Sequence, residues 1–108
     1  MIDTFEKAQE VAELAGKMAQ FASEEGKLPL ARSLAEMSRA ANAPLTPKDL
    51  PALDKELRAT YESLYRPKEE GLADLFRWHP NPATRTQLNA DLIHVRSRLD
   101  ALLLDGPP

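Results

Sequence analysis

Nine prolines divide this 108-residue chain into short segments, and the apolar residues within those segments have helical spacing. The prolines stand at positions 29, 44, 47, 51, 67, 80, 82, 107 and 108. Proline lacks a backbone N–H and clashes with the preceding turn, so helices are expected to begin or end at these positions. Strand-favouring β-branched aliphatic residues are scarce, being limited to Ile2, Val11, Ile93 and Val95. We therefore predict an all-α fold, a small helical bundle of about five helices with no sheet.

The expected bundle has three long and two short helices. The last long helix is the clearest, because leucine and valine recur at alternating spacings of four and three residues from Leu88 to Leu102, a pattern that favours packing along another helix. A short helix is expected after Pro67, with Leu72, Leu75 and Phe76 facing inward. In chain order, the predicted helices cover residues 4–25, 30–41, 50–65, 68–78 and 82–104.

The first predicted helix has an apolar stripe wide enough to contact two neighbours. Alanines widen the stripe and would let another helix approach closely, either within the chain or in a second subunit. A chain of this length is expected to form a single domain, residues 1–108, with a lean hydrophobic core that a second copy would extend. We therefore predict a homo-oligomer, and the candidate residues for self-association are Val11, Ala15, Met18 and Ala22.

Composition excludes several classes of protein. The chain has no cysteine, which rules out disulfides and thiolate chemistry, and its N-terminal region and apolar runs do not resemble a signal peptide or a membrane span. These features predict a soluble cytoplasmic protein with no membrane association. A net charge of −3 argues against a protein that coats nucleic acid, since such proteins usually carry a basic excess.

No motif in the sequence indicates catalysis or metal binding. The two histidines, His79 and His94, do not form a helical pair with metal-ligand spacing, and no glycine-rich phosphate loop is present. Among the serines, only Ser97 has a histidine nearby in helical register, His94, and two such neighbours do not make a catalytic triad. We therefore predict no catalytic residue, no metal and no cofactor, and a protein that is more plausibly a binding module than an enzyme.

Basic residues are concentrated in the last third of the chain. Residues 77–98 contain four arginines and one acidic residue, Asp91, so this part carries a charge of +3 with the histidines neutral. Nucleic-acid binding is therefore an alternative function, although the arginines of the last helix are divided between its two flanks, unlike those of a DNA-reading helix. The candidate nucleic-acid contacts are Arg77, Arg85, Arg96 and Arg98.

The stretch RWHPNPATRTQ, residues 77–87, is expected to form a fixed corner between the last two helices. His79 precedes a proline and must leave the helical conformation, while Asn81 can cap the next helix and Pro82 suits its first position. The corner gathers four residues that are candidates for binding a partner: Arg77, Trp78, His79 and Arg85.

The favoured function is that of a non-catalytic protein interaction module, regulatory, adaptor or assembly in type, that associates with itself. A pocket for a small ligand or an enzyme substrate near Trp78 and His79 is a further alternative. The exposure of Trp78 separates two interpretations of the corner. A buried Trp78 would make it a structural bend, whereas an exposed Trp78 would make it the first place to look for a partner.

Overall fold

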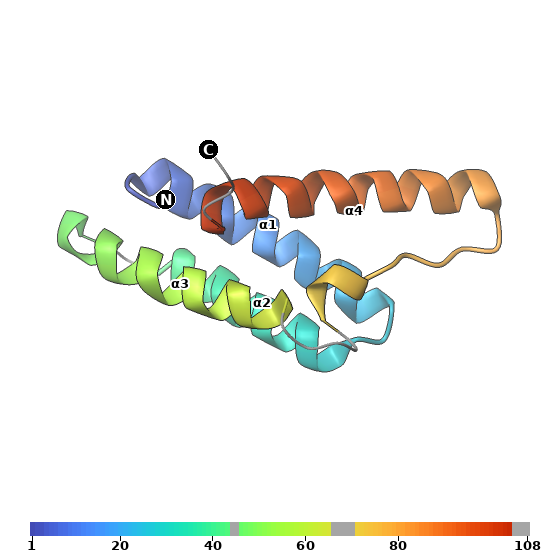
Figure 1. Cartoon of the computed structure of the whole chain (residues 1–108), viewed down its shortest axis with the longest axis horizontal. Helices are drawn as coiled ribbons and strands as arrows, with labels where there is room; N and C mark the ends of the chain where they lie inside the picture. The colour runs from blue at the N-terminus through green and yellow to red at the C-terminus, as the bar shows by residue number, and fades with distance from the viewer. Residues whose placement is uncertain (44–45, 66–70, 105–108) are drawn as a thin grey trace.

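The computed structural model describes residues 1–43, 46–65 and 71–104, and this part of the chain is all-α, as predicted. It contains four α-helices, two short 3-10 turns at Pro47–Asp49 and Leu72–Asp74, and no strand (Figure 1). Within these ranges no helix is both long and apolar enough to cross a membrane. The helices are α1 (Phe5–Glu24), α2 (Leu28–Ala41), α3 (Leu50–Tyr65) and α4 (Pro82–Leu103).

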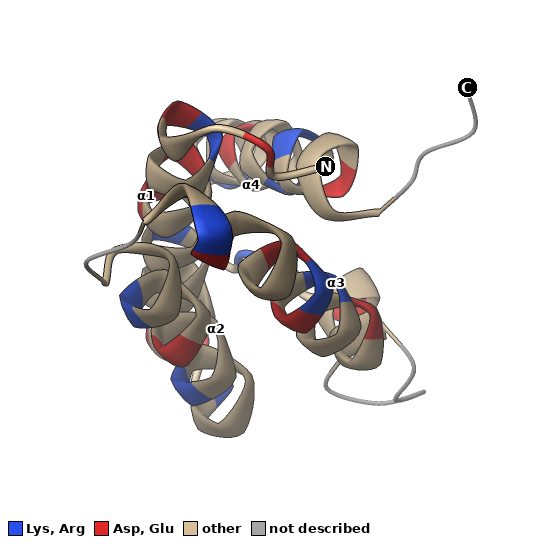
Figure 2. Ribbon diagram, turned by 90° about the vertical axis from the view of Figure 1, so that its left-hand side faces the viewer, with Lys and Arg blue, Asp and Glu red and all other residues tan. Residues whose placement is uncertain are grey.

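The four helices form a ring in which each packs against two others. The pair α1 and α2 makes the most extensive contact, α1 also packs on α4, and α3 completes the ring by touching α2 and α4. The end-on view of Figure 2 shows the four helices running roughly along a common direction. In Figure 1 the N-terminal half of α4 extends past the neighbouring helices, and the buried residues of α4 all lie from Leu92 onward.

Local signals in the sequence set the ends of α1. The side chain of Thr4 accepts a hydrogen bond from the backbone N–H of Lys7 at 3.1 Å, which caps the first turn. At the other end Gly26 adopts a φ of +76°, a left-handed conformation that glycine accommodates without strain, and the chain turns directly into α2. This places Glu24, the last residue of α1, and Glu25, the residue after it, at the end of the bundle to which the segment before α4 returns.

The apolar stripe of α1 is covered by the chain itself. Val11, Ala15, Met18 and Ala22 are each 0% exposed and belong to the core of the described structure. The small side chains let α2 approach closely, and the hydroxyl of Ser38 on α2 donates a hydrogen bond to the carbonyl oxygen of Ala12 at 2.6 Å. Of the two arrangements expected for this stripe, the structure therefore shows the contact within the chain.

The helix predicted at residues 68–78 is wrong over its described part. Residues 66–70 lie outside the described residues, and the chain that follows forms one 3-10 turn, Leu72–Asp74, and then an extended segment. Leu75 has φ −64° and ψ 128°, which is an extended conformation. The predicted count of five helices is corrected to four within the described residues. The physical reason is that the side chains of Glu25, which follows α1, and of Asn89 on α4 form hydrogen bonds with the extended backbone.

Candidate functional site

The segment that connects the second 3-10 turn to α4, residues 75–81, is here called the corner segment. Its first four side chains alternate between the interior and solvent, as those of a strand do. Leu75 and Arg77 are 5% and 6% exposed, whereas Phe76 and Trp78 are 55% and 62% exposed. The segment thus presents two aromatic side chains outward and anchors itself with the two residues that face inward.

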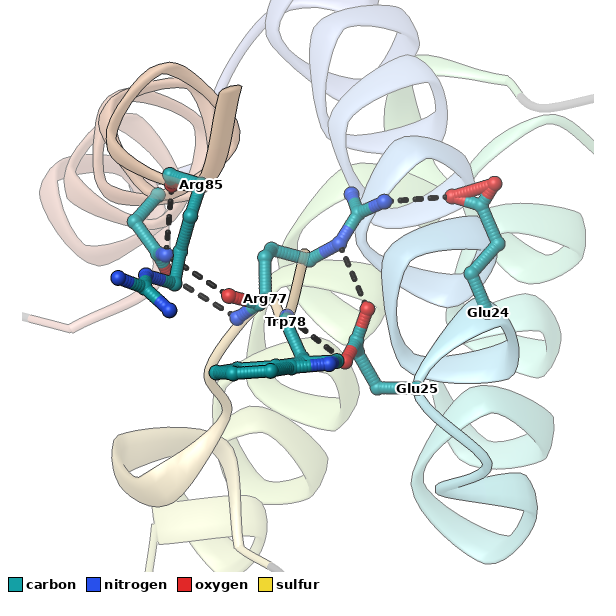
Figure 3. Close-up of polar contacts among 6 residues, drawn as sticks. Glu24, Glu25, Arg77, Trp78 and Arg85 are labelled. Atoms are coloured by element: carbon teal, nitrogen blue, oxygen red, sulfur yellow. Dashed lines mark hydrogen bonds and ion pairs between the residues drawn. The ribbon is translucent and has the colours of Figure 1, made fainter. Parts of the chain in front are cut away.

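Arg77 is the inward anchor on the α1 side (Figure 3). Its Nη2 lies 2.9 Å from Oε1 of Glu24, its Nε lies 3.2 Å from Oε2 of Glu25, and its guanidinium sits 4.6 Å from the ring centre of Phe21. The second oxygen of Glu25 accepts a hydrogen bond from the backbone N–H of Trp78 at 3.0 Å. Glu25 therefore holds both the side chain of one corner residue and the backbone of the next.

Asn89 holds the same segment from the α4 side. Its Oδ1 accepts a hydrogen bond from the N–H of Arg77 at 2.9 Å, and its Nδ2 donates to the carbonyl oxygen of Arg77, also at 2.9 Å. Nδ2 also donates to the carbonyl oxygen of Arg85, one turn earlier on α4. Both backbone polar groups of a buried extended residue are thus satisfied by one side chain, which replaces the hydrogen bonds of a neighbouring strand.

Trp78 lies on the outer face of the corner, where its indole ring contacts a side chain of α4. The guanidinium of Arg85, from the first turn of α4, sits 5.0 Å from the ring centre, within the range of a cation–π contact (Figure 3). Of the four predicted partner-binding residues, Trp78 and Arg85 are therefore adjacent on the surface, while Arg77 is buried behind them. His79 has a structural role, because its Nδ1 accepts from the N–H of Asn81, whose own side chain caps α4.

The four arginines proposed for nucleic-acid binding do not form a common surface. Arg77 is paired with two glutamates, and Arg98 makes a two-pronged contact with Glu10 at 2.6 and 2.9 Å. The hydrogen bonds from Arg98 lower the pKa of Glu10 and raise the pKa of the arginine, so both groups stay charged and neutralise each other. In the end-on view of Figure 2, acidic and basic segments are interspersed on the helices.

Arg85 and Arg96 differ from these two arginines. Within residues 1–43, 46–65 and 71–104, no carboxylate lies at ion-pair distance from either guanidinium. Both lie on α4, and both border depressions in its surface. The positive charge expected for the last third of the chain is therefore carried mainly by Arg85 and Arg96.

Two open depressions adjoin on the face of α4 beside the corner segment, and we call them together the α4 groove. One encloses about 400 Å³ and the other about 310 Å³. They share three lining residues, Phe76, Asn89 and Ile93. The remaining lining residues are Ala73, Asp74, Leu75, Arg85, Thr86, Ala90, Leu92 and Arg96.

Aromatic and aliphatic side chains gather around this groove. Six large apolar residues of the described chain are exposed, and three of them, Phe76, Trp78 and Ile93, lie on the corner segment or the groove wall. Monomeric proteins seldom gather apolar side chains on their surface without a use for them. The concentration distinguishes this face from the rest of the described surface.

The candidate residues for self-association do not contribute to a surface. Val11, Ala15, Met18 and Ala22 are covered within the chain, so a contact between copies would have to use other residues. Self-association itself stays a prediction.

A second polar cluster joins α3 to α4. The hydroxyls of Tyr61 and Tyr65 donate to the same oxygen of Asp100 at 2.7 and 2.6 Å, and the two rings meet edge to face. Burial, followed by the hydrogen bond to Asp100, raises the pKa of Tyr65 to about 12 and raises that of Tyr61 further. Two neutral tyrosines bound to one carboxylate hold α3 against α4. Neither hydroxyl is activated as a base or a nucleophile.

No group of three or more potential metal ligands among histidine, aspartate and glutamate occurs within the described ranges. The sequence interpretation missed Asn89, Glu25 and Ile93, and it was wrong to expect Phe76 to face inward, because this side chain is exposed. The one signal in the sequence for these contacts is the pair of adjacent glutamates at the end of the first helix. Two neighbouring carboxylates can form ion pairs with an arginine from elsewhere in the chain.

Comparison with known proteins adds no relative to these observations. No family model matches the chain, and neither the curated proteins nor the solved structures contain a match.

Proposed function

We propose that this protein is a non-catalytic protein interaction module whose partner contacts the corner segment at Trp78. The observation that carries the proposal is the 62% exposure of the only tryptophan in the chain, at a position where the backbone is held from two sides. Tryptophan and arginine are the residues most often found at the energetic centre of protein interfaces, and here they are stacked.

The polar groups of the corner support a binding role over a catalytic one. Glu25 and Asn89 use their side chains to hold backbone groups of the corner segment, and His79 is occupied by Asn81. These contacts fix a surface in place. We accordingly assign no reaction, metal or cofactor to the site, and we propose the cytoplasm as its location on the composition of the chain.

The exposed aromatic residues lack an evident structural role, which also supports the proposal. Full burial of a large apolar side chain stabilises a protein by about 1.5–3 kcal/mol. Phe76 and Trp78 are more than half exposed and forgo most of that gain. A partner that covers them would recover it.

Quantitative affinity purification from the native cell tests the proposal. The bait is the full chain, compared with Trp78→Ala and with the matched control Phe5→Ala, which removes another exposed aromatic residue, 47% exposed, from the start of α1. We expect at least one protein to be retained by the wild type and by Phe5→Ala and lost with Trp78→Ala.

A set of bound proteins that is the same for all three baits would contradict the proposal. Partners that disappear on nuclease treatment would favour the nucleic-acid alternative. Size-exclusion chromatography with light scattering, run on the same three proteins, reports whether the chain associates with itself and whether Trp78 takes part.

A further inference from the structure

The α4 groove continues the Trp78 surface along the helix. Phe76 lies on the corner segment next to Trp78 and forms one wall of the groove, and Arg85 both stacks on Trp78 and borders the groove. A segment that covers Trp78 could therefore extend along α4 over Ala90 and Ile93. The residues of α4 that line the groove run from Arg85 to Arg96, which suits an elongated ligand better than a compact one.

Two arginines without an ion pair among the described residues border this groove, and one of them, Arg96, also acts electrostatically on the hydroxyl of Tyr65. Arg85 and Arg96 are eleven residues apart on α4, which corresponds to about 16 Å along the axis and almost the same angular position after three turns. Arg77 and Arg98 form ion pairs with glutamates of the same chain. The two arginines of the groove have no carboxylate partner among the residues described. One acidic residue, Asp74, lines the groove at the Arg96 end, so the groove retains a net positive charge.

The charges disfavour a second copy of the chain as the occupant. In a twofold dimer that pairs the two grooves with antiparallel α4 helices, Arg85 of one copy faces Arg96 of the other. With parallel helices each arginine faces its own counterpart. Both arrangements bring arginines together across an interface, and like charges in contact oppose association.

The charges also disfavour a nucleic-acid strand. The groove has two arginines that could contact phosphates and one carboxylate, Asp74, that opposes such contacts. The chain as a whole carries a charge of −3. The apolar walls, Phe76 and Ile93, match aliphatic side chains of a peptide.

Resting on the function proposed above, we infer that the α4 groove receives an acidic amphipathic segment of a protein partner. Its apolar side chains cover Phe76 and Ile93, and its carboxylates, spaced by about three helical turns, pair with Arg85 and Arg96. Trp78 forms the end of the same contact surface. The arginines set the sign of charge that the groove accepts, and the apolar walls supply the contact area.

Selection from a random peptide display library of about 16 residues, long enough for three helical turns, tests this inference directly. The wild-type chain is the target, with the double variant R85E/R96E for comparison. The control variant R32E/R39E has the same net charge change on exposed residues of α2, away from the groove. Circular dichroism and urea unfolding first establish that all three proteins are folded.

We expect the enriched peptides to carry aspartate or glutamate on both sides of an apolar stretch. Their affinity is expected to fall by about tenfold or more with R85E/R96E and to change little with R32E/R39E. Ile93→Asp should reduce binding to a similar extent, because it places a carboxylate between the two arginines.

Three outcomes overturn the inference: no peptide enriched on the wild type, an enriched set without acidic residues, or an equal loss with both double variants. Binding of a labelled single-stranded oligonucleotide in competition with the peptides would overturn it in favour of nucleic acid. The proposed function and the acidic ligand can fail independently of each other, because the first is tested by Trp78→Ala and the second by R85E/R96E. If a Trp78-dependent partner is retained by R85E/R96E, the interaction module stands and the acidic ligand does not.

Discussion

Asn89 satisfies both backbone polar groups of Arg77 with one side-chain amide. Its Oδ1 accepts from the N–H and its Nδ2 donates to the carbonyl oxygen, each at 2.9 Å. The pairing reproduces what an adjacent strand would provide, although the described structure has no sheet. An extended segment can therefore lie against a helical bundle without leaving its buried polar groups unpaired.

Replacing Asn89 should loosen the corner segment. Asn89→Ala removes three hydrogen bonds, two to Arg77 and one to Arg85, and we expect it to lower the free energy of unfolding by about 2 kcal/mol. Asn89→Asp should cost more, because it puts a charged oxygen against two carbonyl oxygens. Urea unfolding measures both effects. Gln87→Ala, which loses one exposed bond to Asp91, is the control and should change stability by less than about 0.5 kcal/mol.

The buried arginine should matter more than the exposed one. The side chain of Arg77 is 7% exposed, so Arg77→Met, which leaves Glu25 without its guanidinium, should cost about 2–3 kcal/mol. Arg98→Met breaks a more exposed pair with Glu10 and should cost less than Arg77→Met, an effect that high salt reduces. Equal losses for the two variants in urea unfolding would mean that Arg77 is not held as described.

Truncation of two neighbouring residues of the corner segment should change stability by very different amounts. Leu75 is 5% exposed, so Leu75→Ala should destabilise the fold by about 2–4 kcal/mol. Phe76 is 55% exposed, and Phe76→Ala should change stability by less than about 1 kcal/mol while weakening binding of the partner. Thermal unfolding of the two variants checks this difference, which the predicted helix, with both residues facing inward, would not produce.

The tyrosine pair predicts a loss of stability at alkaline pH. The pKa of Tyr65 rises from 10.0 to about 12 in the folded chain, chiefly through burial and then through its bond to Asp100. Below about pH 10 both the folded and unfolded chains keep this proton, so the stabilisation is complete. Between about pH 10 and 12 only the unfolded chain releases it, and the free energy of unfolding falls as the pH rises.

Urea midpoints measured through this window test the alkaline prediction. The decline should be smaller for Tyr65→Phe, which has no proton to lose at this position, although Tyr61 contributes in the same direction. An unchanged pH dependence in Tyr65→Phe would exclude Tyr65 as its source. Because the chain has two tyrosines, tyrosinate absorbance follows their ionisation directly.

Fluorescence quenching tests the exposure of Trp78. As the only tryptophan, at 62% exposure, it should emit at long wavelength and be quenched by acrylamide almost as readily as a free indole. Arg85→Ala uncovers one face of the ring and should increase quenching further. A blue-shifted, poorly quenched emission would place the ring in the interior.

The helical class and the corner's capping could be predicted because they depend on local signals. Periodic leucines, the glycine stop at Gly26 and the cap at Asn81 act within a few residues of where they stand. The adjacent placement of Trp78 and Arg85 follows from the same local geometry.

The path of residues 75–78 could not be predicted, because distant residues decide it. Leu72, Leu75 and Phe76 fit one face of a helix, so the sequence pattern favours a helix there. The extended path is stabilised by Asn89, twelve residues from Arg77, and by Glu25, 53 residues from Trp78. No short window of sequence contains these partners. The same long-range bonds hold Arg77 in the interior, although the sequence analysis grouped it with the candidate nucleic-acid contacts.

The double attachment of the corner segment has a consequence for affinity. A flexible loop loses conformational entropy when it binds, and that loss opposes association. Here Asn89 and Glu25 impose the order when the chain folds, so a partner meets Trp78 already in position. Variants of these two residues should therefore weaken binding through entropy, at a site they do not touch, and calorimetry would register the change as a less favourable entropy at nearly constant enthalpy.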